Sequence, residues 1–464
     1  MNGKTAALAS ITALALCLGA ASRWPLADSG AVLWALFHAA FLAAAMAAAF
    51  LALPRFFSLP VQIFIAMVAG VAAGAVFRHF GDAPFLSDYL GIFGKLFILL
   101  LTVVIVPLIF VSVLNGTAGV GDVRRLGPLG VKTLLYYLLT TCVAVLIGLA
   151  LVNLLRPGEG REGLVSSAAT QAAAEKGAGL GRIIQEEALP AVIKNPVMAG
   201  QNPLAVIFFA VILGAALAAG GAQAKPALEV FAALDRALTL IILAVMRLAP
   251  LGVFALMSRA IAELGVEYVL TLGQYCLTVM LGLVLHFCLL TLVVCPLLGR
   301  MPARRFLRGM FPAFEVAFST SSSSATLPVT MRCVTERLGV DKNISSFMLP
   351  LGATVNMDGT ALYLSVASLF VAQVYGLDLS VQAQFMVFLT AVLASIGTAG
   401  IPGASLGLMG IIFTAAGIPA EGIGIVIGVD RLLDMSRTVV NITGDAVGAV
   451  VVARGGDGGA DGSA

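Results

Sequence analysis

Six polar side chains interrupt the mostly apolar segment 422–453 at intervals that suit one face of a helix. They are Asp430, Asp434, Arg437, Thr438, Asn441 and Asp445. Because an α-helix turns about 100° per residue, the six fall within an arc of roughly 100° and form one polar stripe. On membrane-insertion scales, placing an ionised side chain at the centre of a bilayer costs roughly 2.5–3.5 kcal/mol. The stripe must therefore face protein, water, ions or substrate, and it is the first candidate for a functional site.

A second group of oxygen-bearing residues lies in the segment Gly352-Ala-Thr-Val-Asn-Met-Asp-Gly-Thr360, inside an apolar run. The two glycines loosen the hydrogen-bond ladder of a helix, and Asn356 and Asp358 supply side-chain oxygens at the break. Unwound carbonyls together with a carboxylate favour a hard cation such as sodium. An ordinary turn outside the bilayer is the alternative interpretation.

Two other segments are too interrupted to be simple membrane spans. Residues 318–328 are rich in serine, residues 395–405 are rich in Gly and Pro, and both are flanked by helix-compatible apolar residues. Each segment therefore predicts a hairpin that enters the membrane and turns back, since non-helical backbone persists there only where protein or a water-filled cavity satisfies it. A plain structural turn is the alternative for each segment, but paired interrupted segments indicate a transporter's binding site.

The composition predicts a polytopic membrane protein that positions these groups on helices. Of 464 residues, 60% are hydrophobic and 11% are charged, whereas soluble domains carry about 25% charged residues. Apolar segments long enough to span a core of ~30 Å lie near 5–22, 31–53, 60–78, 93–115, 131–155, 204–220, 227–257 and 267–298. The small net charge of +3, with no basic patch among aromatics, argues against nucleic acid as a partner.

Charged loops predict the orientation of the chain in the membrane, and the scattered cysteines and histidines argue against one kind of metal site. Basic residues near 124–132, at Lys225 and near 300–308 place those loops in the cytoplasm, so the long polar stretch 156–203 is extracellular. Neither the six scattered cysteines nor the three distant histidines indicate a metal site built from them. Residues 1–22 are similar to a signal peptide, although they would also suit a membrane helix paired with 31–53.

Four motifs, in this order, resemble the glutamate transporter family, the dicarboxylate/amino acid:cation symporters. They are Ser321-Ser-Ser-Ser-Ala-Thr-Leu-Pro328, Asn356-Met-Asp-Gly-Thr360, Gly400-Ile-Pro-Gly403 and Asp434-Met-Ser-Arg-Thr-Val-Val-Asn-Ile-Thr-Gly-Asp445. The resemblance covers about residues 58–454. It implies an all-α polytopic membrane protein with eight transmembrane helices and two re-entrant helical hairpins. It also implies a homotrimer in the plasma membrane, with a transport domain that moves like an elevator against a scaffold.

The resemblance also implies a domain organisation. Residues 54–298 would be mainly scaffold and trimerisation helices, part of which joins the transport domain. Residues 299–453 would form the core of the transport domain, with both hairpins, the broken helix and the last helix. Residues 1–53 are an N-terminal extension with one or two extra hydrophobic helices, and residues 454–464 are a Gly-rich tail that we expect to be flexible.

By resemblance, Arg437 holds the side-chain carboxylate of an acidic amino acid, a task that suits a planar guanidinium. Asp434 would take the α-amino group. The other expected substrate contacts are Ser322, Ser324, Thr360, Gly403, Thr438 and Asn441. Ser321 and Met435 stand where family members often carry an extra arginine, and Ser405 stands where they often have glycine. These departures affect the expected release of substrate and opening of the second hairpin.

The resemblance implies three sodium positions and no other cofactor. The first would be formed by Gly352, Asn356, Asn441 and Asp445. The second would be formed by Thr354, Ser395, Ile396 and Thr398. The third would be formed by Tyr137, Thr140, Thr141, Asn356 and Asp358. Because many ligands of this kind are backbone carbonyls, the carboxylates Asp358 and Asp445 are the informative members.

The main hypothesis is a sodium-driven symporter for glutamate or aspartate. The nearest alternative keeps the fold and changes the cargo to a C4-dicarboxylate or the coupling ion to a proton. A remote alternative is an intramembrane serine hydrolase, because Gly403-Ala-Ser-Leu-Gly407 fits G-x-S-x-G and His286 would be its base. That motif needs a strand-to-helix turn, which the helical pattern does not predict. A passive channel is a third class, and the carboxylate-rich stripe argues against it.

Overall fold

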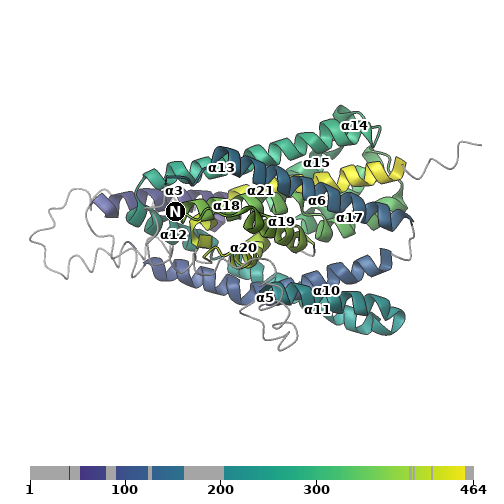
Figure 1. Cartoon of the computed structure of the whole chain (residues 1–464), viewed down its shortest axis with the longest axis horizontal. Helices are drawn as coiled ribbons and strands as arrows, with labels where there is room; N and C mark the ends of the chain where they lie inside the picture. Colours follow the sequence, from purple (N-terminus) through teal and green to yellow (C-terminus); the bar gives the residue numbers. More distant parts are fainter. Residues whose placement is uncertain are drawn as a thin grey trace, which may run out of the picture. The chain divides into compact units, whose positions relative to one another are not determined.

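The computed structural model describes residues 41, 53–79, 90–123, 128–160, 203–396, 400, 403–419 and 422–454. Throughout this part of the chain the regular elements are helices and no strand occurs, as the resemblance implies (Figure 1). The α-helices are α3 (Leu59–His79), α5 (Gly91–Val123), α6 (Pro128–Leu155), α10 (Pro203–Ala219), α11 (Lys225–Met246), α12 (Ala249–Leu264), α13 (Glu267–Cys288), α14 (Cys295–Leu297), α15 (Ala303–Thr320), α16 (Ser323–Arg332), α17 (Lys342–Val355), α18 (Asp358–Val374), α19 (Val381–Ser395), α20 (Ala404–Ala415) and α21 (Ile423–Arg454). The predicted span 5–22, most of the span 31–53, most of the stretch 156–203 and the tail after Arg454 lie outside the described residues.

Four helices in the described residues are long and apolar enough to cross a membrane. They are Leu59–His79, Gly130–Leu155, Glu267–Leu297 and Lys342–Val374. The pair α11 and α12 meets the same requirement together. The predicted segment 227–257 therefore corresponds to a pair of helices with a break at Arg247 and Leu248. Pro250 lies in the first turn of α12 and has no N–H to continue the ladder from α11.

The chain forms two compact units. The first comprises Met1–Thr102, Ile242–Gly273 and Gly424–Leu432, and the second comprises Val103–Ile241, Gln274–Ile423 and Leu433–Ala464. Every residue predicted to bind substrate or cation lies in the second unit, whereas Asp430 of the polar stripe lies in the first. The functional site is therefore a property of that unit.

The first unit is built on the close packing of α3 against α12. A Cβ atom at Gly70 would lie 2.8 Å from the carbonyl oxygen of Phe254, so only glycine allows the backbones to approach this closely. Phe41 packs edge-on against Phe77, with ring centroids 5.1 Å apart, inside the same apolar cluster. Arg78 donates a 3.3 Å hydrogen bond to the carbonyl of Ala262 near the end of this pair.

The second unit is organised around α18, which packs against α6, α19 and α20. Every residue of α18 except Gln373 is buried, as expected for a helix that is apolar on all sides and lies inside a protein. A Cβ atom at Gly148 of α6 would lie 2.9 Å from the carbonyl oxygen of Leu362. The absence of that side chain brings α6 against the start of α18, where the cation-binding residues are predicted.

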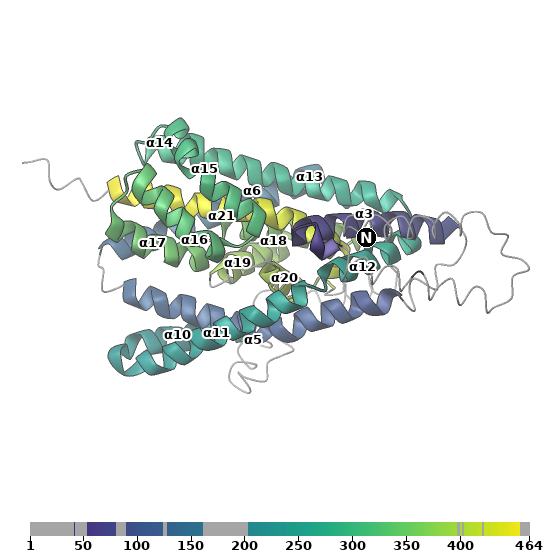
Figure 2. The same cartoon turned by 180° about the vertical axis from the view of Figure 1, so that it is seen from behind.

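Both predicted hairpins are present in this unit. In hairpin 1, α15 ends at Thr320, the following residue Ser321 adopts a left-handed conformation with φ 51°, and Ser322 then caps α16. Figure 2 shows α16 and α17 side by side, as their mutual contacts require. Hairpin 2 pairs α19 with α20, and its tip residues 397–399 and 401–402 lie outside the described residues.

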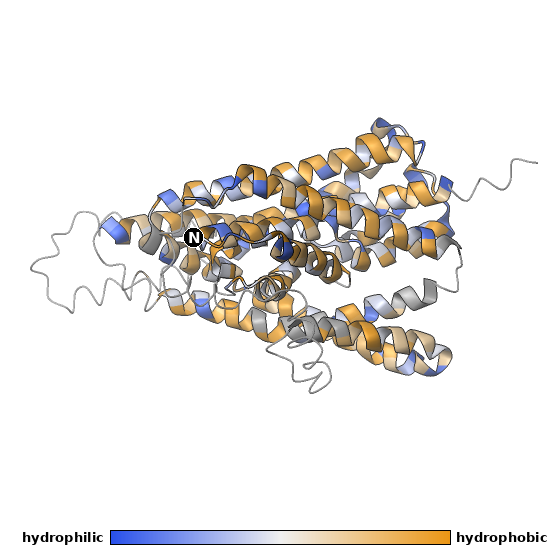
Figure 3. Ribbon diagram, in the orientation of Figure 1, coloured by the Kyte–Doolittle hydropathy of each residue, from blue (hydrophilic) through white to orange (hydrophobic). Residues whose placement is uncertain are grey.

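The outward faces of the helices are apolar, and Figure 3 shows that hydrophobic residues dominate the ribbons. On α13 the exposed side chains include Leu277, Leu281, Val284 and Leu285, all on one helical face. A contiguous exposed apolar face of this kind suits contact with lipid tails rather than water. The polar residues Thr278 and His286 of the same helix are buried.

Candidate functional site

The polar stripe on α21 is buried along its whole length. Each of its six residues is at most 7% exposed, and Arg437 is 0% exposed. The stripe thus faces protein, as the free-energy argument requires. Five of the six belong to the second unit, from Asp434 to Asp445.

Arg437 and Asp434 form a buried ion pair on successive turns of α21. Arg437 Nη2 lies 2.7 Å from Asp434 Oδ1, and the guanidinium carbon lies 3.8 Å from the centroid of the Tyr363 ring. The other carboxylate oxygen, Asp434 Oδ2, accepts a 3.3 Å hydrogen bond from the backbone N–H of Gly403. Gly403 has a φ of 79°, a left-handed conformation that favours glycine at this corner of hairpin 2. One charged pair is therefore in contact with both α18 and hairpin 2.

Asn441 connects the break between α17 and α18 to α21. Its Oδ1 accepts a 2.8 Å hydrogen bond from the backbone N–H of Gly359, and its Nδ2 donates to Thr360 Oγ1 at 3.3 Å. A Cβ atom at Gly359 would lie 2.6 Å from the carbonyl oxygen of Arg437. Glycine at this position allows α21 to approach the break, and the predicted substrate contacts Thr360 and Asn441 are neighbours as a result. Thr438, the remaining predicted contact on this helix, donates to the carbonyl of Asp434 at 2.8 Å.

The two hairpins meet at Gly400. Ser322 Oγ donates a 2.6 Å hydrogen bond to the Gly400 carbonyl, and the backbone N–H of Ser324 donates to the same oxygen at 3.2 Å. A Cβ atom at Gly400 would lie 2.6 Å from Ser324 Oγ and 2.9 Å from the carbonyl oxygen of Ala353. Ser322 is buried, whereas Ser324 is exposed. Ser322 and Gly400 therefore lie close to the end of α17. The hydroxyl of Ser322 is used for the hydrogen bond that joins the two hairpins.

The predicted third cation position is a cluster of oxygen atoms. Thr141 Oγ1 lies 2.7 Å and Thr140 Oγ1 3.4 Å from Asp358 Oδ1. Thr140 Oγ1 also lies 3.3 Å from Asn356 Oδ1 and 3.2 Å from the backbone carbonyl of Tyr137. The side chains of these residues are buried. Oxygen ligands from a carboxylate, an amide, hydroxyls and a carbonyl are the donor set that a hard cation prefers.

The predicted first position brings together Gly352, Asn356 and Asp445. Asn356 Nδ2 donates a 3.0 Å hydrogen bond to Asp445 Oδ1, and the side chain of Asp445 is 2% exposed. A Cβ atom at Gly352 would collide with Asp445 Oδ1, so the carboxylate fills the space that glycine leaves open. Asn441, the fourth predicted member, lies one helical turn from Asp445, and its Oδ1 accepts the hydrogen bond from the backbone N–H of Gly359.

The predicted second position is less complete in the described residues. Thr354 Oγ1 donates to the Leu351 carbonyl at 3.0 Å, and Ser395 Oγ donates to the Val392 carbonyl at 2.8 Å, both within their own helices. Ile396 packs against the apolar core beneath hairpin 1. Thr398 lies outside the described residues. This position therefore remains a prediction.

Three residues next to the predicted site were not among its predicted substrate or cation ligands. His286 Nε2 lies 3.0 Å from Asp358 Oδ2, with both side chains fully buried. Tyr363 supplies the ring beneath Arg437, one helical turn after Thr360. Ser321 Oγ is buried at the corner of hairpin 1 and has no hydrogen-bond partner among the described residues. A single polar side chain inside an apolar span, the signal used for Asp358, would have indicated His286.

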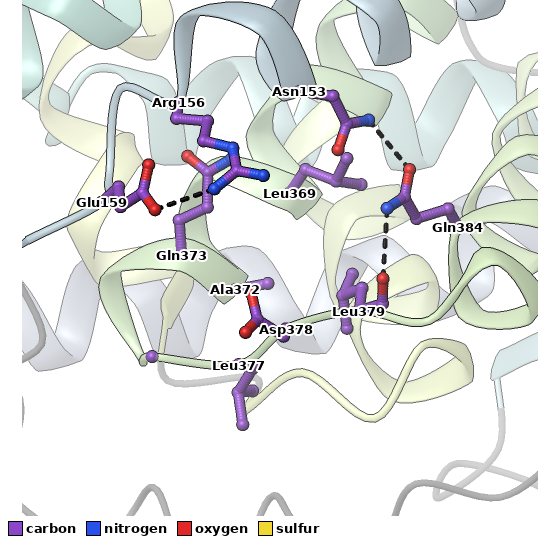
Figure 4. A pocket seen from close by; sticks show the side chains of 11 residues that line it. Asn153, Arg156, Glu159, Leu369, Ala372, Gln373, Leu377, Asp378, Leu379 and Gln384 are labelled. Carbon is purple, nitrogen blue, oxygen red and sulfur yellow. Dashed lines mark hydrogen bonds and ion pairs between the residues drawn. The ribbon is translucent and has the colours of Figure 1, made fainter.

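A polar cavity of about 270 Å³ lies away from these residues, between the ends of α6 and α18 and the start of α19. Figure 4 shows Asn153 Nδ2 donating to Gln384 Oε1, and Gln384 Nε2 donating to the Leu379 carbonyl, at 2.8 and 3.1 Å. Arg156 and Glu159 form a solvent-exposed pair at its rim, which contributes only about 0–1 kcal/mol. No predicted substrate or cation residue lines this cavity. Its contacts instead fix the first turn of hairpin 2 to α6.

The hydrolase alternative lacks its structural context. Ser405 lies in the first turn of α20, after Gly403, and no strand precedes it in the described part of hairpin 2. The Nε2 atom of His286 is hydrogen-bonded to Asp358. The strand-to-helix turn that exposes a nucleophilic serine in hydrolases therefore has no counterpart here.

Comparisons with known proteins show the family of the chain. A model described as the sodium:dicarboxylate symporter family matches residues 59–455. The chain is 36% identical over 403 residues to the proton/sodium-glutamate symport protein of Bacillus subtilis, covering 86% of this chain and 92% of that protein. It is 35% identical to an excitatory amino acid transporter of Caenorhabditis elegans, covering 83% and 85%. It is 34% identical to the proton/glutamate-aspartate symporter of Escherichia coli, covering 86% and 93%.

Proposed function

Because the chain belongs to the sodium:dicarboxylate symporter family, we propose that this integral membrane protein is a secondary active symporter that takes up glutamate or aspartate with sodium. The observation that carries the proposal is the buried ion pair of Arg437 and Asp434. Truncating one partner of such a pair costs about 2–5 kcal/mol, because the other charge is left buried and unpaired. A ligand that separates the pair must therefore replace both partners.

An acidic amino acid meets this requirement, since it carries an ammonium group and a second carboxylate. The carboxylate would accept from Arg437, as a planar guanidinium favours, and the ammonium would donate to Asp434. A C4-dicarboxylate would satisfy Arg437 and leave Asp434 without a cation. The pair thus favours an amino acid over a dicarboxylate, with Thr360, Thr438 and Asn441 as further contacts.

The relation between the two hairpins supports coupled transport. Ser322 and Ser324 both donate hydrogen bonds to the Gly400 carbonyl and so join the two hairpins. The main-chain carboxylate of a substrate bound beside Ser324 and Gly403 would therefore lie next to this contact and change its stability. We infer that cations and substrate together stabilise this closed contact, and that closure allows the crossing. A passive channel would need no such link between the binding residues and the hairpin tips.

Sodium is the proposed driving ion, and the oxygen cluster around Asp358 supports it. Four side-chain oxygens and one carbonyl converge without nitrogen or sulfur ligands among them. The relatives are named for proton, sodium or both, so proton coupling of the same fold is the alternative. We further propose a plasma-membrane homotrimer with an elevator mechanism, in which residues 299–453 form the core of the moving domain and much of 54–298 the scaffold.

The decisive experiment is uptake of radiolabelled aspartate by the purified protein in liposomes. Accumulation under an inward sodium gradient, without a pH gradient, is the expected result. Accumulation that requires a proton gradient alone would contradict sodium coupling. Competition by unlabelled glutamate but not by succinate is expected, and equal competition by succinate would contradict the amino-acid assignment. For variants of Arg437, the matched control is Arg304→Ala, which changes an exposed arginine at the start of α15.

A further inference from the structure

His286 is a buried polar residue on a helix whose other face is apolar and exposed. It lies near the end of α13, and its side chain is 0% exposed. Burying an imidazole in an apolar span is unfavourable unless it is hydrogen-bonded. Its hydrogen-bond partner is the carboxylate of Asp358, which lies 72 positions away in the chain.

The two oxygens of Asp358 have different partners. Oδ1 is 2.7 Å from Thr141 Oγ1 and 3.4 Å from Thr140 Oγ1, on the side of α6 where the oxygen cluster lies. Oδ2 is 3.0 Å from His286 Nε2, on the side of α13. A carboxylate can rotate about its Cβ–Cγ bond, and that torsion is broad and two-fold when nothing holds it. The contact at Oδ2, together with that of Thr141 at Oδ1, therefore fixes the rotation of the carboxylate.

The direction of the hydrogen bond follows from the chemistry of the two groups. A carboxylate that binds a cation is ionised and only accepts hydrogen bonds, so in the cation-binding state Nε2 of His286 must carry the proton and donate. The other ring nitrogen, Nδ1, has no hydrogen-bond partner among the described residues. Among the described residues the imidazole thus makes one polar contact, and that contact is with the predicted third cation position.

We propose that His286 is a positioning residue for this cation position. Its Nε2–H holds Oδ2 of Asp358, so that Oδ1 stays among the oxygens of Thr140 and Asn356 when no cation is present. Residues that orient a metal-binding carboxylate typically change cation affinity 10- to 100-fold when they are removed. The inference rests on the proposed sodium coupling, and it assigns part of the sodium affinity to a helix that supplies no ligand.

The test uses the purified full-length protein and sodium titrations of its thermal unfolding without substrate, followed by uptake in liposomes. His286→Phe keeps a ring and removes the donor, and it should raise the half-saturating sodium concentration by about 10- to 100-fold. His286→Gln keeps a donor at the reach of Nε2, and it should restore most of the affinity. At saturating sodium, the KM for aspartate of both variants should remain near the wild-type value. Thr278→Val is the matched control, because Thr278 is buried on α13 and bonds only to its own helix at Gln274.

The outcomes separate this inference from the proposed function. A His286→Phe variant that titrates like wild type overturns the positioning role, and so does a Gln variant as impaired as Phe. If the Phe variant does not fold, His286→Asn replaces it, because its shorter amide cannot reach Oδ2 and should behave as a donor loss. A wild-type protein whose unfolding does not respond to sodium contradicts the sodium coupling itself, and the inference fails with it.

Discussion

Asn356 and Asp445 are joined by a 3.0 Å hydrogen bond between Nδ2 and Oδ1, although 89 positions separate them in the chain. The oxygen of the same Asn356 amide lies 3.3 Å from Thr140 Oγ1, in the other predicted cation position. One side chain therefore contacts both positions, with its donor on one and its acceptor on the other. A cation that reorients this amide at one position would change the hydrogen bonding of the carboxylate at the second.

The first prediction concerns the charge of Asp445. In Asp445→Asn the new amide oxygen can still accept from Asn356, so the fold should be kept while the negative charge is lost. We expect the sodium concentration for half-maximal uptake to rise by more than about 10-fold, since a hard cation prefers an anionic oxygen. Sodium titrations of aspartate uptake measure this, with the exposed residue Asp378 changed to Asn as the control. An unchanged titration would remove Asp445 from the cation sites.

The second prediction concerns Arg437. Arg437→Ala should reduce aspartate uptake by at least about 30-fold, because loss of one partner of a buried charge pair costs roughly 2 kcal/mol or more. Arg437→Lys should recover only part of the uptake, since an ammonium cannot form two parallel hydrogen bonds to a carboxylate. Liposome uptake measures both variants, after size-exclusion chromatography has shown that they fold. Wild-type affinity for aspartate in the Ala variant would refute the role of this guanidinium.

The third prediction concerns the ring beneath that guanidinium. Tyr363→Phe keeps the ring face 3.8 Å from the Arg437 carbon and should leave the KM for aspartate nearly unchanged. Tyr363→Leu removes the ring and should weaken binding by about 0.5–2 kcal/mol, the range of cation–π contacts. The KM for aspartate, measured for both variants in liposome uptake, tests this role of the ring. Equal effects of Phe and Leu would show that the ring face does not hold Arg437.

The sequence predicts the elements of the site well and their mutual contacts less well. Burial of the stripe on α21 follows from periodicity, because charge in an apolar helix is tolerated on one face only. The break between Val355 and Asp358 follows from the glycines and from polar residues in an apolar run. These are local signals, and the structure contains both features. The residue roles at these places remain predictions.

Contacts between distant segments could not be predicted in the same way. The proximity of His286 to Asp358 depends on how α13 packs against α18, and periodicity on one helix carries no information about its neighbour. The meeting of Ser322 with Gly400 depends in the same way on two separate hairpins. The break between α11 and α12, inside the predicted segment 227–257, could not be predicted for a different reason, because hydropathy is insensitive to the missing N–H of Pro250.

The fourth prediction concerns the contact between the hairpins at Gly400. In Gly400→Ala the new methyl group would lie 2.6 Å from Ser324 Oγ and 2.9 Å from the Ala353 carbonyl oxygen. The serine can rotate away but the carbonyl belongs to α17, so hairpin 2 must shift and lose the bond from Ser322. Overpacking of this kind costs about 1–3 kcal/mol, and we expect a folded protein with a lower thermal midpoint and little uptake.

Two further variants make this prediction specific. Gly273→Ala is the control, because a Cβ atom there would meet no atom within 4 Å, and it should leave stability and uptake unchanged. Adding Ser324→Gly to Gly400→Ala relieves the clash with the hydroxyl but not with the carbonyl, so it should restore only part of the uptake. If Gly400→Ala alone transports aspartate as fast as wild type, close contact between the hairpin tips is not required for the crossing.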